Sequence, residues 1–293
     1  MINIDNNVIL YENKIKNIDN NKDCAIIITS THKYSYIWEP FFELMNIYWK
    51  DRNLDLFFIS DGNPEYLTNK YNINVYKVKN DIGYLTSYEY VARDIKNRFN
   101  YKHFLLLLDD DLIERNVNNN LILEYIDILT KNKDIGCIQT MPCPAPTEKT
   151  YKYNNIELRE FDKNNIYSFN FQSRIWNIDY FLKLTSLHTD EDSKRTVWGT
   201  QKIKGMNIEN ELSIHVRSLP EKILGWNRLH KEHWGVLESP LPYTPTGIVR
   251  GKLEYFAKVL LEKHNIPIKY DGEYCYNPNT IEIINNLQSF LNK

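Results

Sequence analysis

Three consecutive carboxylates, Asp109 to Asp111, directly follow an apolar run at residues 104–108. A short apolar run without alternation is typical of a strand buried on both faces, as in the centre of a mainly parallel sheet. Like charges a few Å apart raise each other's pKa, so a cation usually compensates them. A divalent metal is the natural candidate. An Asp-rich helix cap is the simpler alternative, but the carboxyl end of a strand is where open α/β sheets bind ligands.

Sugar transfer from a nucleotide diphosphate is one reaction that such a cluster supports. The departing diphosphate must be neutralised, which a divalent ion does as a Lewis acid. Mg²⁺ and Mn²⁺ prefer carboxylate oxygens; one of Asp109 and Asp111 can ligate the ion while the other reaches a ribose or a metal-bound water. Asp110 is kept as a donor-binding candidate, although strand alternation predicts that it points to the other face and is structural. The acceptor hydroxyl needs a general base, which a Glu can supply.

The elements that must position these acids alternate between strands and helices. Strands are expected at 24–28, 54–59, 75–78 and 104–108, and helices at 37–49 and 86–99. This order predicts βαβ units and an α/β fold with a mainly parallel central sheet flanked by helices. Three of the strands end in polar residues, so a nucleotide crevice is expected along their shared edge. Neither GxGxxG nor GxxxxGK[ST] is present, so metal and side chains must hold the diphosphate.

The second half of the chain predicts a less regular pattern. We expect a helix at 121–129, strands at 135–140 and 167–171, a loop at 142–146 and a helix at 178–187. Glu209 and Glu211 are expected to open a helix at 208–214. Residues 188–206 and 225–251 are expected to be loops, the latter over the site, and 251–265 and 281–291 helices. We expect one domain, 1–293, with a nucleotide-sugar-binding half (about 24–135), an acceptor and catalytic half (about 136–240) and a C-terminal helical segment (about 241–293).

Bulk composition excludes some classes of function. A net charge of −2 argues against binding to nucleic acid through phosphate neutralisation. The four cysteines show no CxxC pair or zinc-like spacing. The N-terminus lacks the pattern of a signal peptide, and no apolar stretch reaches the length of a membrane span. These features predict a soluble, cytoplasmic protein without a transmembrane segment.

Taken in order, these motifs resemble those of the GT-A glycosyltransferases. The set consists of Thr29-Ser30-Thr31, Asp61-Gly62, Gly83 with Ala92-Arg93-Asp94, and Leu108-Asp109-Asp110-Asp111. Residues 171–177 and 207–211 are similar to the acceptor-side segment of inverting members. The resemblance covers about residues 24–240. It implies a GT-A fold with a Rossmann-like half, a nucleotide-sugar donor such as a UDP-sugar, Mn²⁺ or Mg²⁺ held by a DxD motif, and a glycan or other hydroxyl acceptor.

The resemblance also implies roles for donor-side residues. Asp61 would contact the base or its ribose, and Thr29 and Thr31 would line the same pocket. Arg93 would pair with the diphosphate, although a salt bridge on its helix is an equal alternative. Asp94 departs from the family pattern, which often has Asn after Ala-Arg.

Metal and catalytic roles follow from the same resemblance. Asp111 would ligate the metal, with Asp109 near the metal or ribose. Many members supply a late His to the metal, for which His233 is preferred over His230. Glu209 would be the base, with Glu211 as its rival. A charged insert before Glu209 departs from the common pattern.

Three other functions compete with glycosyl transfer. In a haloacid-dehalogenase-like phosphatase, Asp109 and Asp111 would form DxDx[TV], but Ile113 occupies the last position and the motif does not follow the first strand. A nucleotidyltransferase normally has a Gly-rich loop after strand one, which residues 29–32 lack. A non-catalytic carbohydrate-binding protein is the third alternative, and the complete set of acids argues against it.

Overall fold

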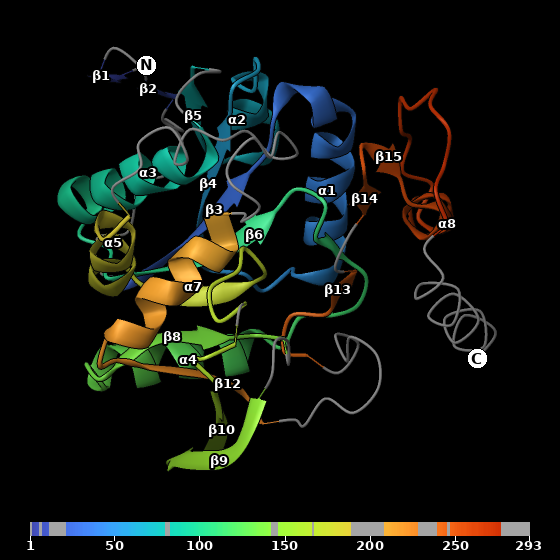
Figure 1. Ribbon diagram of the computed structural model, residues 1–293. Helices are drawn as coiled ribbons and strands as arrows, with labels where there is room; N and C mark the ends of the chain where they lie inside the picture. The colour runs from blue at the N-terminus through green and yellow to red at the C-terminus, as the bar shows by residue number, and fades with distance from the viewer. Residues whose placement is uncertain are drawn as a thin grey trace.

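The computed structural model describes residues 2–5, 8–11, 22–79, 83–141, 146–165, 167–188, 208–227, 239–244 and 247–276. It shows an α/β fold in which helices cover both faces of a large central sheet (Figure 1). The strand order is β1-β2-β5-β4-β3-β6-β11-β8-β12-β10-β9. No helix in these ranges is long and apolar enough to cross a membrane.

The centre of the sheet is parallel, as the sequence predicts. It consists of β3 (Cys24–Thr29), β4 (Asp55–Ser60), β5 (Asn74–Val78) and β6 (His103–Leu108). The connections contain η1 (His32–Tyr34) with α1 (Ser35–Tyr48), then α2 (Tyr66–Tyr71), then α3 (Tyr84–Phe99). These βαβ units bring the carboxyl ends of β3, β4 and β6 to one edge.

The flanking strands bring antiparallel pairing, which the sequence did not indicate. β11 (Arg174–Asn177) lies antiparallel between β6 and β8 (Ile135–Gln139). β12 (Lys222–Trp226) is parallel to β8, and the hairpin of β9 (Pro146–Tyr153) and β10 (Ile156–Phe161) extends beyond it. At the other margin, β1 (Ile2–Asp5) and β2 (Val8–Tyr11) are antiparallel to each other and β2 to β5. Because β11 runs against β6, its first residue lies at the edge where β6 ends.

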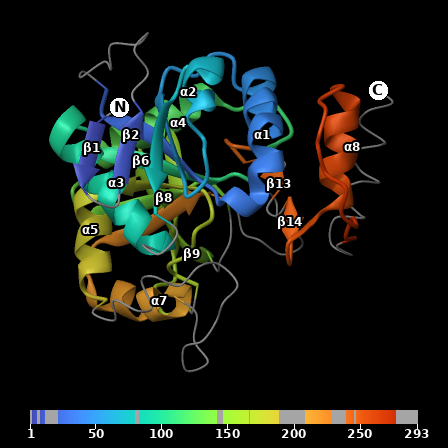
Figure 2. The ribbon, with the colours of Figure 1, turned by 90° about the horizontal axis from the view of Figure 1, so that it is seen from above.

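Helices complete the two faces. α4 (Asn119–Lys131) and α1 pack on one face, and α3, α5 (Ile178–Ser186) and α7 (Ile208–Ser218) on the other. α8 (Tyr255–Lys263) stands beside α1 in both views (Figures 1 and 2), where Tyr48 Oη lies 2.5 Å from His264 Nε2. Two short ladders join β7 (Leu112–Ile113) to β13 (Tyr243–Thr244), and β14 (Ile248–Val249) to β15 (Lys252–Leu253).

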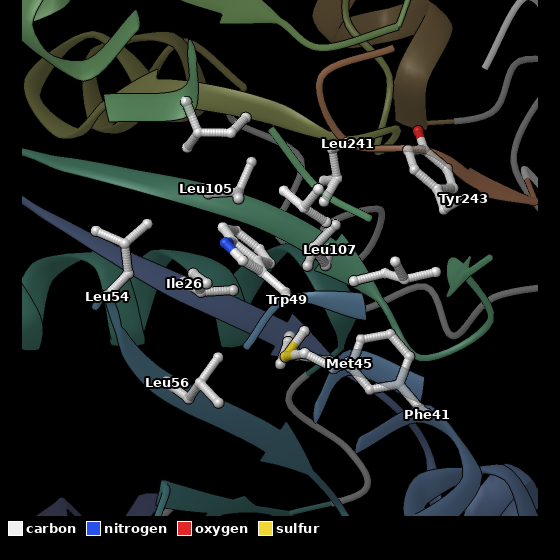
Figure 3. Close-up of a cluster of buried hydrophobic side chains, with 14 of the residues drawn as sticks. Ile26, Phe41, Met45, Trp49, Leu54, Leu56, Leu105, Leu107, Leu241 and Tyr243 are labelled. Carbon is white, nitrogen blue, oxygen red and sulfur yellow. The ribbon is translucent and has the colours of Figure 1, made fainter. Parts of the chain in front are cut away.

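The core explains why β6 is apolar without alternation. Leu105 and Leu107 join Met45 and Trp49 of α1 in the cluster on one face (Figure 3). Leu106 and its alternate neighbours belong to the cluster on the other face. Burial of each such side chain contributes about 1.5–3 kcal/mol, so β6 is anchored from both sides.

Some expected elements in the second half are wrong. Residues 167–171 form bends instead of a strand, and β11 begins only at Arg174. The N–H groups of Phe169 and Phe171 donate to side chains of α7, not to a strand. The polar stretch 146–161, which includes the end of the expected loop, forms a hairpin.

The C-terminal expectations need similar correction. The helix expected from 251 begins at Tyr255, capped by Glu254 Oε2, because β14 and β15 occupy the preceding residues. In the expected surface loop 225–251, residues 239–243 are buried. The helix expected at 281–291 and nearly all of the loop expected at 188–206 lie outside the described residues.

Candidate functional site

The ends of β3 and β6 place the acids beside Ser30. The strands pair in parallel up to Thr29 and Leu108, and the N–H of Asp109 continues the ladder by donating to Thr29 O at 3.2 Å. The Ser30 hydroxyl donates to the Asp109 carboxylate, and its oxygen accepts a hydrogen bond from Nε1 of Trp38. The two polar residues that follow the strands, Ser30 after β3 and Asp109 after β6, therefore join the two strand ends.

The three acids form a turn, so strand alternation does not apply to Asp110. The N–H of Asp111 donates to Leu108 O at 3.1 Å, while Asp111 Oδ2 accepts from Leu108 N at 2.9 Å. Asp110 instead faces the C-terminal segment: its carbonyl accepts from Gly247 N at 2.9 Å, and its carboxylate accepts from the N–H of Ile248. Asp110 thus contacts the C-terminal segment through both its carbonyl and its carboxylate.

Burial disfavours the ionised form of all three acids. Burial raises the pKa of Asp110 to about 6, and burial together with the Asp110 charge raises the pKa of Asp109 and of Asp111 well above their usual values. No basic group in the described part of the chain contributes to these shifts. Asp111 is fully buried, and its Oδ1 has no hydrogen-bond partner there.

The carboxylate oxygens of this turn are suited as ligands to a hard divalent cation. Carboxylate oxygens are the ligands that Mg²⁺ and Mn²⁺ prefer, and Mg²⁺ is commonly held by one or two carboxylates together with substrate phosphates. A complete cage is not present: within the described ranges no three His, Cys, Asp or Glu side chains are grouped to hold a metal. His230 and His233 lie outside those ranges. Asp111 and Asp109 therefore fit a partial site that a ligand would complete.

Asp61 connects a pocket to this edge. The N–H of His32 donates to Asp61 Oδ1 at 2.5 Å, which joins the loops after β3 and β4. Beside them lies a pocket of about 370 Å³, lined by His32, Ser35, Tyr36, Trp38, Asn63, Tyr66 and Lys269. Trp38 of the pocket donates a hydrogen bond to Ser30, which in turn donates to Asp109. Burial raises the pKa of Tyr36, and the charges of Asp109 and Asp110 raise it further.

Sequence reasoning missed most of this lining. Trp38 lies in the helix predicted at 37–49, but its place in the pocket was not predicted. Tyr36 and Tyr66 stand near the starts of two helices that follow strands, a position that could have suggested a place at the edge. Lys269 comes from beyond α8, and nothing in its local sequence indicates the pocket.

The remaining donor-side candidates occupy different places. The Thr29 hydroxyl lies 2.6 Å from Tyr88 Oη of α3, and Thr31 precedes η1 as its half-buried N-cap. Arg93 is exposed on α3, and the structure does not bring it to the acids. Asp94 accepts from Tyr76 Oη at 2.6 Å and pairs with Arg98 at 3.2 Å, so it anchors α3.

Glu209 reaches the same edge from α7. Its Oε1 accepts a hydrogen bond from the N–H of Phe171 at 3.0 Å. The Phe171 ring stacks on Tyr88, with centroids 5.8 Å apart, and Tyr88 contacts Thr29 at the end of β3. Burial raises the pKa of Glu209, while the Phe171 N–H and the charge of Arg174 lower it. One carboxylate oxygen is thus held, and Oε2 has no hydrogen-bond partner in the described structure.

Glu211 points elsewhere. Two residues apart on a helix are separated by about 200°, so the two carboxylates cannot share a direction. Glu211 Oε2 lies 3.6 Å from His188 Nε2, just after α5. The helix therefore favours Glu209 over Glu211 as the group at the edge.

Comparison with known proteins gives no family assignment. No family model matches the chain, and no curated protein matches it. Solved structures similar to it include a cytidylyltransferase from Leptospira borgpetersenii, with a TM-score of 0.43 and 11% identity over 86% of this chain and 99% of that one. Another is 4-diphosphocytidyl-2C-methyl-D-erythritol synthase from Anaerococcus prevotii, with a TM-score of 0.46 and 13% identity over 85% and 98%.

A third similar structure is S. aureus TarS 1–349, with a TM-score of 0.45 and 12% identity over 74% of this chain and 66% of that one. The same fragment in complex with UDP-GlcNAc gives a TM-score of 0.41 and 11% identity. Because every TM-score is below 0.5, these similarities carry no argument about function.

Proposed function

We propose that this chain transfers a sugar from a nucleotide-diphosphate donor, most simply a UDP-sugar, to a hydroxyl acceptor such as a glycan, with inversion at the anomeric carbon. One observation carries the proposal. Three carboxylates follow β6, of which Asp109 and Asp111 are buried; no basic group of the described structure contributes to their pKa shifts, and they lie at the same sheet edge as Glu209. The order of the motifs, which resembles that of GT-A enzymes, also supports it.

The donor would bind across the loops after β3 and β4. The aromatic pocket beside Asp61 is wide enough for a nucleoside, and Tyr66 and Asn63 offer stacking and hydrogen bonding to a base. The diphosphate would then extend towards Asp109 and Asp111. These two residues would hold Mn²⁺ or Mg²⁺, which neutralises the diphosphate as it departs.

Glu209 would accept the proton of the acceptor hydroxyl. Its raised pKa and partial burial suit a base that must take up a proton during attack. The Phe171 N–H would fix Oε1, leaving Oε2 for the hydroxyl. Direct attack by that hydroxyl on the anomeric carbon, with no enzyme nucleophile, is what makes the predicted outcome inverting.

A donor screen tests the proposal. UDP-, GDP- and dTDP-sugars are incubated with the protein and Mn²⁺, and nucleotide binding and release are measured. We expect binding of a UDP-sugar that requires Mn²⁺ and is abolished by Asp111→Asn, with Asp127→Asn as an exposed acid-to-amide control. If no nucleotide sugar binds or turns over, with or without metal, the proposal is wrong.

The phosphatase alternative has its own test. A haloacid-dehalogenase-like enzyme would hydrolyse an aryl phosphate with Mg²⁺ through an accessible Asp109 nucleophile. Asp109 is buried and accepts a hydrogen bond from Ser30, so we expect no hydrolysis. Hydrolysis that Asp109→Asn removes would replace the glycosyltransferase proposal.

A further inference from the structure

Arg174 is a buried cation that the proposed reaction has not used. It is the first residue of β11 and has no exposed surface. Its Nη1 donates to the carbonyl of Ser168 at 2.7 Å, and its guanidinium lies 5.4 Å from the centre of the Trp176 ring. β11 pairs Arg174 with Leu106 of β6, two residues before that strand ends. Arg174 therefore lies close to the edge that carries the acids.

The charge of Arg174 is not neutralised by a direct ion pair. Its guanidinium forms no ion pair with a carboxylate of the described residues, and its Nε and Nη2 have no hydrogen-bond partner among them. Burial of an unpaired charge is costly, so an apolar residue would be the more stable choice in this core. A function that requires a positive charge explains why an arginine occupies the position.

The chain between Arg174 and α7 is held from both sides. Arg174 binds Ser168 O, while Ser213 Oγ of α7 accepts from Phe169 N at 2.9 Å. Glu209 Oε1 accepts from Phe171 N at 3.0 Å. The residues 168–171 thus form a short bridge with the guanidinium at one end and the Glu209 carboxylate at the other. Loss of the Arg174 contact would release the segment that orients Glu209.

We propose that Arg174 is a positioning residue for Glu209: it fixes the 168–171 bridge whose N–H group holds the carboxylate, and its positive charge favours the ionised form of that carboxylate. This inference rests on the proposed function for the role of Glu209 as a base. The effect on the charge state of Glu209, however, is a property of the folded protein and is independent of any substrate.

Electrostatics agree with this geometry. Burial raises the pKa of Glu209, and Arg174 is the one side chain of the described structure whose charge lowers it. Glu211 and His215 lie on the same helix as Glu209, His188 Nε2 lies 3.6 Å from Glu211 Oε2, and Cys137 Sγ lies 4.0 Å from Arg174 Nη1. None of these four contributes to the shift of Glu209. The Cys137 thiol, whose pKa burial raises to about 11, is uncharged at neutral pH.

Substitution of Arg174 separates its hydrogen bond from its charge. Arg174→Gln is neutral but retains an N–H group for Ser168 O, whereas Arg174→Lys retains the charge. Arg159→Met is the matched control, because Arg159 is also largely buried and donates to a backbone carbonyl, Thr147 O, at 2.9 Å, but on β10. Glu carboxyl carbons are labelled with ¹³C, and Glu209 is assigned from the signal that Glu209→Gln removes.

In Arg174→Gln we expect the NMR-measured pKa of Glu209 to rise by roughly half a unit to one unit. Arg174→Lys should restore most of the difference, and Arg159→Met should change nothing. An unchanged pKa in Arg174→Gln overturns the inference whether or not the protein is a glycosyltransferase. If Arg174→Gln does not fold, Arg174→Met takes its place as the neutral variant, and an unchanged Glu209 pKa in Arg174→Met overturns the inference.

The kinetic test applies once a donor is identified. In Arg174→Gln, the acid limb of the plot of kcat against pH should move to higher pH by as much as the pKa of Glu209 rises. At a given pH on that limb, kcat therefore falls roughly three- to tenfold. Mn²⁺-dependent donor binding and the donor KM should stay within about twofold, because Arg174 is not placed at the donor. A uniform loss of kcat at every pH would show a merely structural role. Absence of turnover in the wild type, with the NMR result as expected, would contradict only the proposed function.

Discussion

The N–H of Phe171 donates to Oε1 of Glu209 at 3.0 Å, and this bond joins α7 to the segment that leads into β11. Since β11 runs antiparallel beside β6, the segment arrives where Asp109–Asp111 begin. A backbone group therefore ties the candidate base to the segment that leads to the edge of the candidate metal site, although Glu209 and the acids are far apart in the chain.

Substitution of the two glutamates of α7 should have opposite outcomes. Glu209→Gln should leave Mn²⁺-dependent UDP binding unchanged and lower transfer at least a hundredfold, as expected for loss of a general base. Glu211→Gln should keep transfer within about threefold, since its carboxylate faces His188. Calorimetry measures binding and nucleotide release measures transfer. Full activity of Glu209→Gln, with loss in Glu211→Gln, would assign the base to the other residue.

Asp111→Asn should stabilise the metal-free protein at pH 7. A neutral amide can still accept from Leu108 N, and it removes a buried group whose pKa burial and the neighbouring acids raise. We expect a gain of roughly 1 kcal/mol, which corresponds to a rise in Tm of about 2 °C. Differential scanning calorimetry without metal measures the change.

The same variant should lose the response to metal and nucleotide. Mn²⁺ with UDP should raise the Tm of the wild type, because a ligand at a hundred times its Kd adds about 2.7 kcal/mol. Asp111→Asn should show no such rise. Asp127→Asn removes only an exposed ion pair with Lys131, so it should behave as wild type. A metal-dependent rise that persists in Asp111→Asn would place the ion elsewhere.

The sequence predicted the parallel part of the sheet well because its signals are local. Apolar runs such as 104–108 are bounded by polar residues, and their alternation with helices fixes the parallel order of β3, β4, β5 and β6. Right-handed crossovers then bring the residues after each strand to one edge. The contact of Ser30 with Asp109 follows from this topology without knowledge of the side-chain packing.

The other half depends on contacts between distant segments. The insertion of β11 between β6 and β8 is antiparallel, and no periodicity in the sequence indicates it. Residues 167–171 alternate between polar and apolar as a strand does. However, the N–H groups of Phe169 and Phe171 donate to the side chains of Ser213 and Glu209 instead of to a neighbouring strand. The pairing of Asp110 with Gly247, and the place of Lys269 in the pocket, likewise arise only from tertiary packing.

Tyr66→Ala should weaken UDP binding with little effect on folding. Tyr66 lines the pocket and is 44% exposed, so it is available to stack on a base. Loss of such a stack typically costs about 1–3 kcal/mol, and we expect Kd to rise roughly tenfold. Tyr276→Ala is the control, because Tyr276 is 63% exposed and stacks on Tyr255 instead. Equal Kd values for both variants would exclude the pocket as the base site.

Gly247→Ala should disturb the contact between the C-terminal segment and the acids. A Cβ at this position would lie 2.9 Å from Asp110 O, a backbone atom that cannot rotate away. The N–H of Gly247 must then move from that carbonyl, at a cost of about 1–3 kcal/mol. In Gly272→Ala the nearest atom is the Tyr270 hydroxyl, which can shift, so this control should lose less stability. Thermal melts of both variants, with and without Mn²⁺ and UDP, measure the difference.

His103 should make the protein less stable in acid. Burial lowers the pKa of this histidine from 6.5 to about 4, so the folded state keeps it neutral where the unfolded chain is protonated. Its contribution to the free energy of unfolding is fully present above pH 6.5 and is lost as the pH falls towards 4, up to about 3 kcal/mol.

The buried acids have raised pKa values and act in the opposite direction, so the wild-type curve alone does not isolate the histidine. Urea unfolding of wild type and His103→Gln between pH 7 and 4 does, because Gln can still bond to Thr130 Oγ1 but does not titrate. The wild type should lose more stability than the variant in this interval, whereas parallel curves would show that His103 does not titrate as its burial requires.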